Sequence, residues 1–406
     1  MKGENGMLGR RGQILVALMF FLVCVPIFKI GPISLSFFVG LLLIVYILTK
    51  RPQYISLRKD LKVLLWFAVI SILSILISPV TLDFSSLYTI VQISYWLVLT
   101  IIFYNISTIV ENRIIWRSII FSLLVIGAIF ILIRPQEEGG IMSENEASYI
   151  VISIWPLGLI NLKKYKRIIY CIAAFIILFI IGSRTGLIIF LLQILVFLFA
   201  EKLASRKLAL GVLVLLGTSI LVSNERFREQ IADTIFQDNY EMGVLIKNPE
   251  LALQFDKSWV QRRIQQEKCK QVFTKNPFLG VGPLNGVEYN INIDVSKIDN
   301  VDDRILSAEY DRSTSRSTHN SYYQMLAENG LLGFPLIAFF LVRTIYFLYK
   351  KRYNSKTTIW ILGAFLGMCV NLYMVSAFWG SLTWILLGVY AGFGKRIKQD
   401  TMLTNQ

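Results

Sequence analysis

The side chain best suited to proton transfer in this sequence is His319, the only histidine among its 406 residues. It lies in the run Arg316-Ser-Thr-His-Asn-Ser-Tyr-Tyr-Gln-Met-Leu-Ala-Glu-Asn-Gly-Leu-Leu-Gly333. The apolar residues after Gly333 can enter a bilayer, so we expect His319 to lie close to a membrane–water boundary. An ionisable group in that place is a functional-site hypothesis, and a surface histidine at a helix entry is the plainer alternative.

The same run predicts a helix that begins beside His319. Ser317 or Thr318 can cap its first turn. Residues that recur at three- and four-residue steps share one stripe of such a helix. In this run they are His319, Tyr322, Leu326, Gly330 and Gly333. The polar start of the helix would thus lead into an apolar span.

Arginine side chains are the second group that could do chemistry, because the planar guanidinium matches phosphate oxygens. Arg184 lies in Gly182-Ser-Arg-Thr-Gly186, which leaves almost no loop between two predicted helices and so places Arg184 at the top of the pair. An arginine that reaches to lipid headgroups is an equal alternative. Further candidate cations for an anionic substrate are Arg262, Arg263 and Arg316.

Other motifs favour plain structural interpretations. Gly280-Val-Gly-Pro-Leu-Asn-Gly286 lacks the Gly-Lys-Ser/Thr ending of a P-loop, so we interpret it as a tight turn after a helix. The aspartates before His319 fit no standard calcium loop. A zinc site is also improbable, because the large polar segment offers only one histidine and one cysteine, Cys269, as ligands. We therefore expect no metal and no cofactor. These aspartates are Asp294, Asp299, Asp302, Asp303 and Asp311.

Composition decides the fold class. Hydrophobic residues make up 55% of the chain and charged ones 17%, and apolar runs of bilayer-crossing length follow one another. We predict an all-α polytopic membrane protein, one membrane domain over residues 1–406 with about twelve helices. The predicted helices lie near 13–29, 32–49, 61–78, 87–104, 116–133, 147–162, 167–182, 184–200, 207–223, 330–349, 357–375 and 379–394.

This pattern places nine helices in residues 13–223, a large loop with the site residues in 224–329, and three helices in 330–394. Lys and Arg concentrate in alternate loops, which predicts cytoplasmic termini and an extracytoplasmic large loop. The formal charge of +15 is then an orientation signal, and we expect no nucleic acid partner. A partly amphipathic pattern from Trp259 to Phe273, ended by Asn276-Pro277, predicts a helix inside the loop.

Together these features resemble the O-antigen ligase and polymerase superfamily of bacterial membrane glycosyltransferases. The resemblance rests on the Ser183-Arg184 turn, the long late loop, and the pattern His319-Asn320-x-Tyr322, Leu326-x-Glu328-x-Gly330-x-x-Gly333. Asn276-Pro-Phe-Leu-Gly-Val-Gly282 is also similar to the loop of that family. The likeness covers residues 182–349 well and the first five helices only by topology.

The resemblance implies a C-type glycosyltransferase (GT-C) architecture, with a cavity under the large helical loop between helices 9 and 10. The donor would be a glycan on a polyprenyl pyrophosphate, such as undecaprenyl pyrophosphate, and no metal would take part. His319 would be the catalytic base. Substrate-binding residues would be Arg184, Asn320, Tyr322, Glu328 and one loop arginine among Arg316, Arg262 and Arg263.

Three functions remain open. The first choice is a polymerase of O-antigen, capsule or exopolysaccharide that extends a lipid-linked repeat unit at the outer face of the bacterial cytoplasmic (inner) membrane. The alternatives are an O-antigen ligase, which transfers the glycan to a lipid A-core or other acceptor in lipopolysaccharide biosynthesis, and a transporter of lipid-linked oligosaccharides. Expected partners are the lipid-linked donor, the glycan acceptor, membrane lipids, and possible flippase and chain-length regulator proteins.

Overall fold

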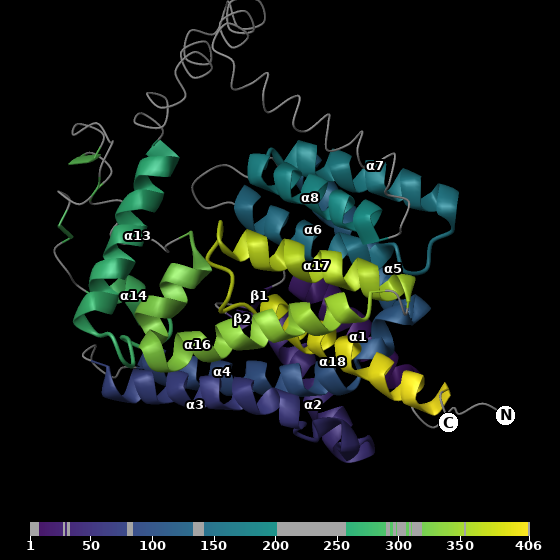
Figure 1. Cartoon of the computed structure of the whole chain (residues 1–406), viewed down its shortest axis with the longest axis horizontal. Helices are drawn as coiled ribbons and strands as arrows, with labels where there is room; N and C mark the ends of the chain where they lie inside the picture. Colours follow the sequence, from purple (N-terminus) through teal and green to yellow (C-terminus); the bar gives the residue numbers. More distant parts are fainter. Residues whose placement is uncertain are drawn as a thin grey trace, which may run out of the picture.

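The computed structural model describes residues 8–26, 29–30, 33–78, 84–132, 142–200, 257–289, 293–294, 298, 306–307, 310, 319–352 and 355–404. In this part of the chain the elements are α1 (Arg10–Cys24), β1 (Lys29–Ile30), β2 (Ile33–Ser34), α2 (Leu35–Lys50), η2 (Pro52–Ile55), η3 (Lys59–Leu61), α3 (Lys62–Ile77), α4 (Phe84–Asn105), η4 (Ser107–Glu111), α5 (Arg113–Leu132), α6 (Glu144–Gly158), α7 (Lys164–Ile181), α8 (Arg184–Ala200), α13 (Lys257–Lys275), α14 (Asn285–Glu288), α16 (Ser321–Lys350), α17 (Lys356–Leu372) and α18 (Ser381–Thr404). Figure 1 shows them as a bundle of helices, with α13 beside the first part of α16.

Eleven of the twelve predicted helical ranges overlap helices α1–α8 and α16–α18, and the range near 207–223 lies outside the described residues. Four described helices are long and apolar enough to cross a membrane, and further apolar helices are shorter. The qualifying segments are Lys59–Ile77, Phe84–Asn105, Arg113–Leu132 and Ser321–Lys350. The all-helical membrane class is therefore supported, while the number of crossings stays a prediction.

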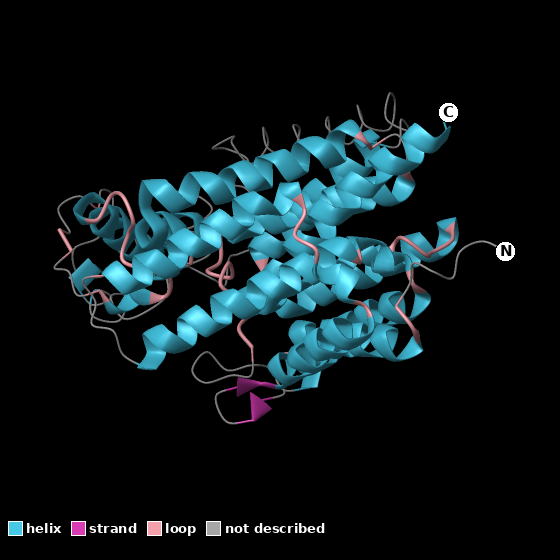
Figure 2. Cartoon of the chain, turned by 90° about the horizontal axis from the view of Figure 1, so that it is seen from below, coloured by secondary structure: helices cyan, strands magenta, loops and turns pink. Residues whose placement is uncertain are grey.

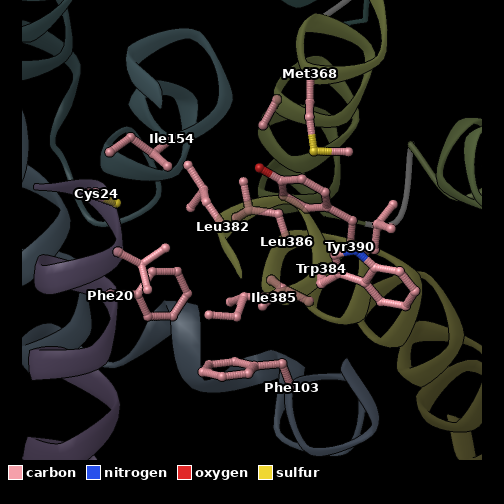
Figure 3. Packing of buried hydrophobic residues seen from close by; sticks show 14 of the residues in the cluster. Phe20, Cys24, Phe103, Ile154, Met368, Leu382, Trp384, Ile385, Leu386 and Tyr390 are labelled. Atoms are coloured by element: carbon pink, nitrogen blue, oxygen red, sulfur yellow. The ribbon is translucent and has the colours of Figure 1, made fainter. Parts of the chain in front are cut away.

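The core forms around α18. In Figure 3 its Leu382, Ile385 and Tyr390 lie among Phe20 of α1, Phe103 of α4 and side chains of α6 and α17. Gly388 and Gly392 allow α18 to approach α4 closely, because a Cβ on either would lie within 2.4 Å of a carbonyl oxygen of α4. Small residues at helix contacts are the usual means of close packing in a membrane.

The remaining helices pack in pairs around this core. α16 lies against α3, α17 against α6 and α8, and α1 against α2 and α5. The two short strands β1 and β2 form an antiparallel hairpin at the edge of the bundle (Figure 2), with Lys29 opposite Ser34. This hairpin leads into α2 through Ser34, whose Oγ accepts a bond from the Ser36 N–H.

A backbone break divides α16. Gly330 has φ 57° and ψ −161°, which is not helical and is accessible essentially only to glycine. The predicted boundary between loop and membrane helix, at 329/330, falls at this break. The helix itself begins at Ser321, close to the start beside His319 that the sequence predicts, so the break lies inside α16.

The turn that follows α13 fills the break. Four backbone hydrogen bonds join the two segments, and they replace the bonds that an unbroken helix would make between these groups in α16. The bonds run from Val281 N to Ala327 O (3.1 Å), Gly282 N to Glu328 O (2.9 Å), Leu331 N to Pro277 O (2.8 Å) and Leu332 N to Phe278 O (3.0 Å). The predicted tight turn thus has a defined partner.

Two serines of α3 and its C-cap serine bind the same region. Ser71 Oγ donates to Asn329 Oδ1 at 2.6 Å, Ser74 Oγ donates to the carbonyl oxygens of Leu279 and Glu328, and Ser78 Oγ donates to Val281 O at 2.6 Å. Ser71 and Ser74 lie three residues apart on one face of α3, and Ser78 follows as its C-cap. The bonds of Ser71 and Ser74 join α3 to α16.

The helix predicted inside the large loop is α13, and its last residue Lys275 precedes Asn276-Pro277 as expected. Val260, Ile264 and Val272 of α13 form a second apolar cluster with Val281 and Ala327. α13 and the turn after it are therefore packed on the start of α16 through both side chains and backbone.

We expect Gly330→Ala to destabilise the protein strongly. The positive φ alone costs about 1–3 kcal/mol, and the added Cβ would lie 2.3 Å from Phe278 O. The midpoint of thermal unfolding in detergent measures the effect. Gly394→Ala is the matched control, because its Cβ would meet Leu348 at an ordinary 3.5 Å. Equal midpoints for the two variants would contradict the proposed importance of the break.

Candidate active site

His319 lies immediately before α16 and not on its stripe, which corrects the predicted start of this helix. The N-cap is Asn320, whose Oδ1 accepts bonds from Tyr322 N (3.0 Å) and Tyr323 N (3.2 Å). The predicted caps, Ser317 and Thr318, lie outside the described residues. His319 itself has φ 46°, an uncommon backbone conformation for a residue with a side chain. Such residues concentrate at functional sites.

Ser321 connects this histidine to the segment between α17 and α18. Its Oγ donates to Val375 O at 2.6 Å and accepts from Ala377 N at 3.1 Å, and its N–H also donates to Val375 O. The side chain is fully buried. Because His319 is two residues away, these bonds place it against residues 375–377.

His319 lines a cavity of about 480 Å³ between these segments. Its lining includes the aromatic residues Trp379 and Tyr149 together with many small polar residues. Aromatic and apolar walls with a few polar groups are typical of small-ligand sites. The polar lining residues are Ser34, Ser36, Ser143, Asn145, Glu146, Ser376, Ser381 and Thr383.

Arg184 begins α8 next to one wall of this cavity. The chain turns at Gly182 (φ 80°), and Ser183 Oγ accepts a bond from Gly186 N at 3.1 Å, which confirms the predicted tight turn. A Cβ added at Gly182 or Gly186 would lie within 4 Å of Glu144 or Ser148 of α6, and the start of α6 lines the cavity. The Arg184 backbone therefore lies near the cavity, while its side chain lies outside the described part.

Asn320, Tyr322 and Glu328 are not part of the cavity lining. Asn320 caps α16, and the Tyr322 hydroxyl donates to Cys369 O at 2.7 Å. Glu328 is fully buried. Its carboxylate accepts bonds from Gln324 Nε2 (3.0 Å), Trp379 Nε1 (2.6 Å) and the backbone N–H groups of Leu284 and Gly286. These three residues therefore bond to segments around the cavity without lining it.

Glu328 also connects the cavity to the turn that fills the break in α16. One carboxylate oxygen binds Trp379, a residue of the cavity lining, and the carboxylate also binds the backbone at Leu284 and Gly286. Trp379 stacks on Phe67 and Trp96 at ring-centroid distances of 5.9 and 6.2 Å. The position of this cavity wall thus depends on α3, α4 and the turn after α13.

The arginines of α13 lie outside the cavity lining as the structure describes it, and Arg316 lies outside the described residues. Arg262 Nε is buried and has no hydrogen-bond partner, whereas Arg263 interacts with another group of the chain. Nearby, burial lowers the pKa of Lys268. A half-buried guanidinium with an unpartnered donor suits an anionic ligand.

Sequence reasoning missed most of the cavity wall. Asn145 and Glu146 belong to the polar run before the apolar part of α6, and the first turn of α6 is capped by Ser143. Trp379, Ser381 and Thr383 form a polar interruption between two apolar helices. Both interruptions were visible as patterns, but the sequence did not indicate that they meet. Within the described residues no group of three His, Cys, Asp or Glu side chains could hold a metal ion.

Fold and cavity together define a helical integral membrane protein with an imidazole in a polar cavity beside helix ends. Among protein families, the model described as O-antigen ligase matches residues 169–340. The match supports the O-antigen ligase/polymerase superfamily and confirms the predicted resemblance. Members of this family are glycosyltransferase-like enzymes that act on lipid-linked sugars. The search of curated proteins found no match.

Proposed function

We propose that this protein is a polysaccharide polymerase that moves a glycan from a polyprenyl pyrophosphate to a sugar hydroxyl of a second lipid-linked repeat unit. The observation that carries the proposal is the place of His319. This residue lines a cavity with polar groups, and its own backbone has an unusual positive φ. The family match supports the general reaction. Acceptor, linkage and donor lipid are part of the proposal.

In the proposed reaction the acceptor hydroxyl attacks the first carbon of the donor sugar. A glycosidic C–O bond forms while the bond from that carbon to the pyrophosphate oxygen breaks. His319 accepts the hydroxyl proton, and the lipid pyrophosphate leaves with the bonding electrons. The backbone of His319 is fixed by the Asn320 cap and the Ser321 bonds, and it would hold the imidazole in one place.

Charge on the leaving pyrophosphate must be stabilised, and arginines are the available cations. Arg184 begins a helix beside the cavity, and Arg262 has a buried donor without a partner. We therefore favour Arg262 over Arg263 as the loop arginine, with Arg316 still a candidate. The reaction needs no metal or other cofactor in this scheme.

The cavity wall suits a carbohydrate. Sugar rings present apolar C–H faces and many hydroxyls, and they match an aromatic ring flanked by short polar groups. Trp379 and Tyr149 are aromatic residues of the lining, and Asn145, Glu146 and Ser381 are among its polar residues. Asn320, Tyr322 and Glu328 would act as positioning residues that keep this wall in place.

A ligase is the second candidate, because the matching family model is described as O-antigen ligase. A ligase needs one lipid-linked donor and a different acceptor, whereas a polymerase must admit two lipid-linked substrates. For either enzyme we propose that the cavity faces the outer side of the bacterial cytoplasmic membrane, with both termini in the cytoplasm. Flippase and chain-length regulator proteins would then be functional partners.

His319→Asn should abolish most of the activity without loss of the fold. Asparagine tolerates a positive φ but cannot take up the proton, and general bases contribute about 10²–10⁴-fold to rate. Turnover of a lipid-linked oligosaccharide by the purified protein measures the loss, and the unfolding midpoint monitors the fold. Near-normal turnover in this variant would return His319 to a structural role.

Arg262→Lys should be nearly as harmful as Arg262→Ala, because a point charge does not replace a bidentate fork on phosphate. Arg263→Ala is the neighbouring control and should retain more turnover. The same assay measures all three variants. Full activity in Arg262→Lys, or a greater loss in Arg263→Ala, would reject Arg262 as the pyrophosphate contact.

Deletion of the gene separates the two candidate enzymes. Without a polymerase, surface molecules should carry at most one repeat unit, and long chains should be missing even from the carrier lipid. Electrophoresis of surface glycans and of extracted carrier-linked glycans measures both. Long polymer that accumulates on the carrier and never reaches the surface acceptor would identify a ligase.

A further inference from the structure

A second cavity, of about 290 Å³, lies at the opposite end of α16 from His319. Arg343 comes from the end of α16 and Lys351 is the C-cap of that helix, η3 contributes Lys59 and Asp60, and α4 contributes Tyr104. Small-molecule sites begin at roughly 300 Å³, so the volume suits a compact group. The proposed glycosyl transfer uses none of these residues.

We propose that this second cavity binds the phosphate of an anionic lipid headgroup. Three of its charged side chains, Lys59, Arg343 and Lys351, are cations, and one, Asp60, is a carboxylate. The lining thus has an excess of positive charge, which favours an anion.

Existing bonds hold two of the cations, Arg343 and Lys351, in place. Arg343 forms an ion pair with Asp60, and the Tyr104 hydroxyl donates to the other Asp60 oxygen at 2.9 Å. Lys351 Nζ donates to Gly394 O at 2.6 Å, which fixes its stem against α18. A guanidinium has five N–H donors and an ammonium three, so these contacts still allow each cation to bind a phosphate oxygen.

The cavity lies where a headgroup would be. Arg343 follows Ser321 by 22 residues, which corresponds to roughly 33 Å of helix and matches a hydrocarbon core of about 30 Å. If the start of α16 lies at one membrane boundary, Arg343 therefore lies near the other. Tyr346 and Tyr349 beside it are about half exposed, at 55% and 54%. Exposed tyrosines of this kind mark the membrane interface.

A lipid is favoured over a soluble phosphate compound because apolar residues share the lining. Phe340 and Phe347 contribute to the cavity together with the cations. Basic pockets between helices at the cytoplasmic leaflet bind acidic headgroups, and apolar neighbours can contact the glycerol and upper acyl chain. This assignment holds whichever reaction the His319 cavity performs.

The test uses the purified full chain in detergent, titrated with dioctanoyl phosphatidylglycerol, dioctanoyl phosphatidylcholine or inorganic phosphate. The rise of the unfolding temperature with ligand gives an apparent dissociation constant. Phosphatidylglycerol should bind, and the other two should bind at least about tenfold more weakly. Equal effects of the two lipids would overturn the proposal, and equal binding of inorganic phosphate would overturn the lipid assignment.

Variants localise the effect. Lys59→Gln combined with Lys351→Gln should weaken phosphatidylglycerol binding about tenfold or more. Lys350→Gln is the control, because Lys350 is exposed on the same helix but does not line the cavity. A loss in the control as large as in the double variant would overturn the site.

Asp60→Asn should tighten the binding of phosphatidylglycerol. A gain in affinity cannot result from poor folding, so this variant controls for that effect. The change removes the carboxylate that repels phosphate, while the amide oxygen can still accept from Tyr104. The apparent dissociation constant for phosphatidylglycerol should fall. Unchanged or weaker binding would show that the charge of the cavity does not govern the interaction.

Discussion

The break of α16 at Gly330 depends on one physical constraint: backbone groups inside a membrane helix need partners. An unpaired N–H or C=O costs several kcal/mol in hydrocarbon. Here the turn at residues 277–282 pairs with the groups on both sides of the break, and hydroxyls of α3 add further donors. The turn, α3 and α16 therefore form one hydrogen-bonded unit and cannot move independently without loss of these bonds.

This unit reaches the candidate site through Glu328. Its buried carboxylate joins the turn to Trp379, and Trp379 forms part of the cavity wall. Near His319, Ser321 binds Val375 and Ala377 and so holds the adjacent backbone in place. The site thus combines segments that are distant in the chain, and each is held by a buried polar contact rather than by apolar packing alone.

Apolar run length predicted the helices well, since hydrophobic stretches of bilayer length have few other folds available. The turn at Gly182 and the stop at Asn276-Pro277 followed from local chemistry of the same kind. The cap at Asn320 was missed because several residues in a row are good caps, and only tertiary contacts choose among them. The partners of Gly330, Glu328 and Trp379 were beyond prediction, because periodicity gives the face of a helix but not the element that covers it.

The hydroxyls of α3 also bear on how the protein is assembled. Ser71, Ser74 and Ser78 bind groups that are synthesised about two hundred or more residues later. Until α16 arrives, these hydroxyls must bond to their own helix, as Ser71 also does with Phe67 O at 2.8 Å. Insertion of α3 into the bilayer therefore does not require its final neighbours. Docking of the completed turn would be a late step, in which these hydroxyls form their bonds between segments.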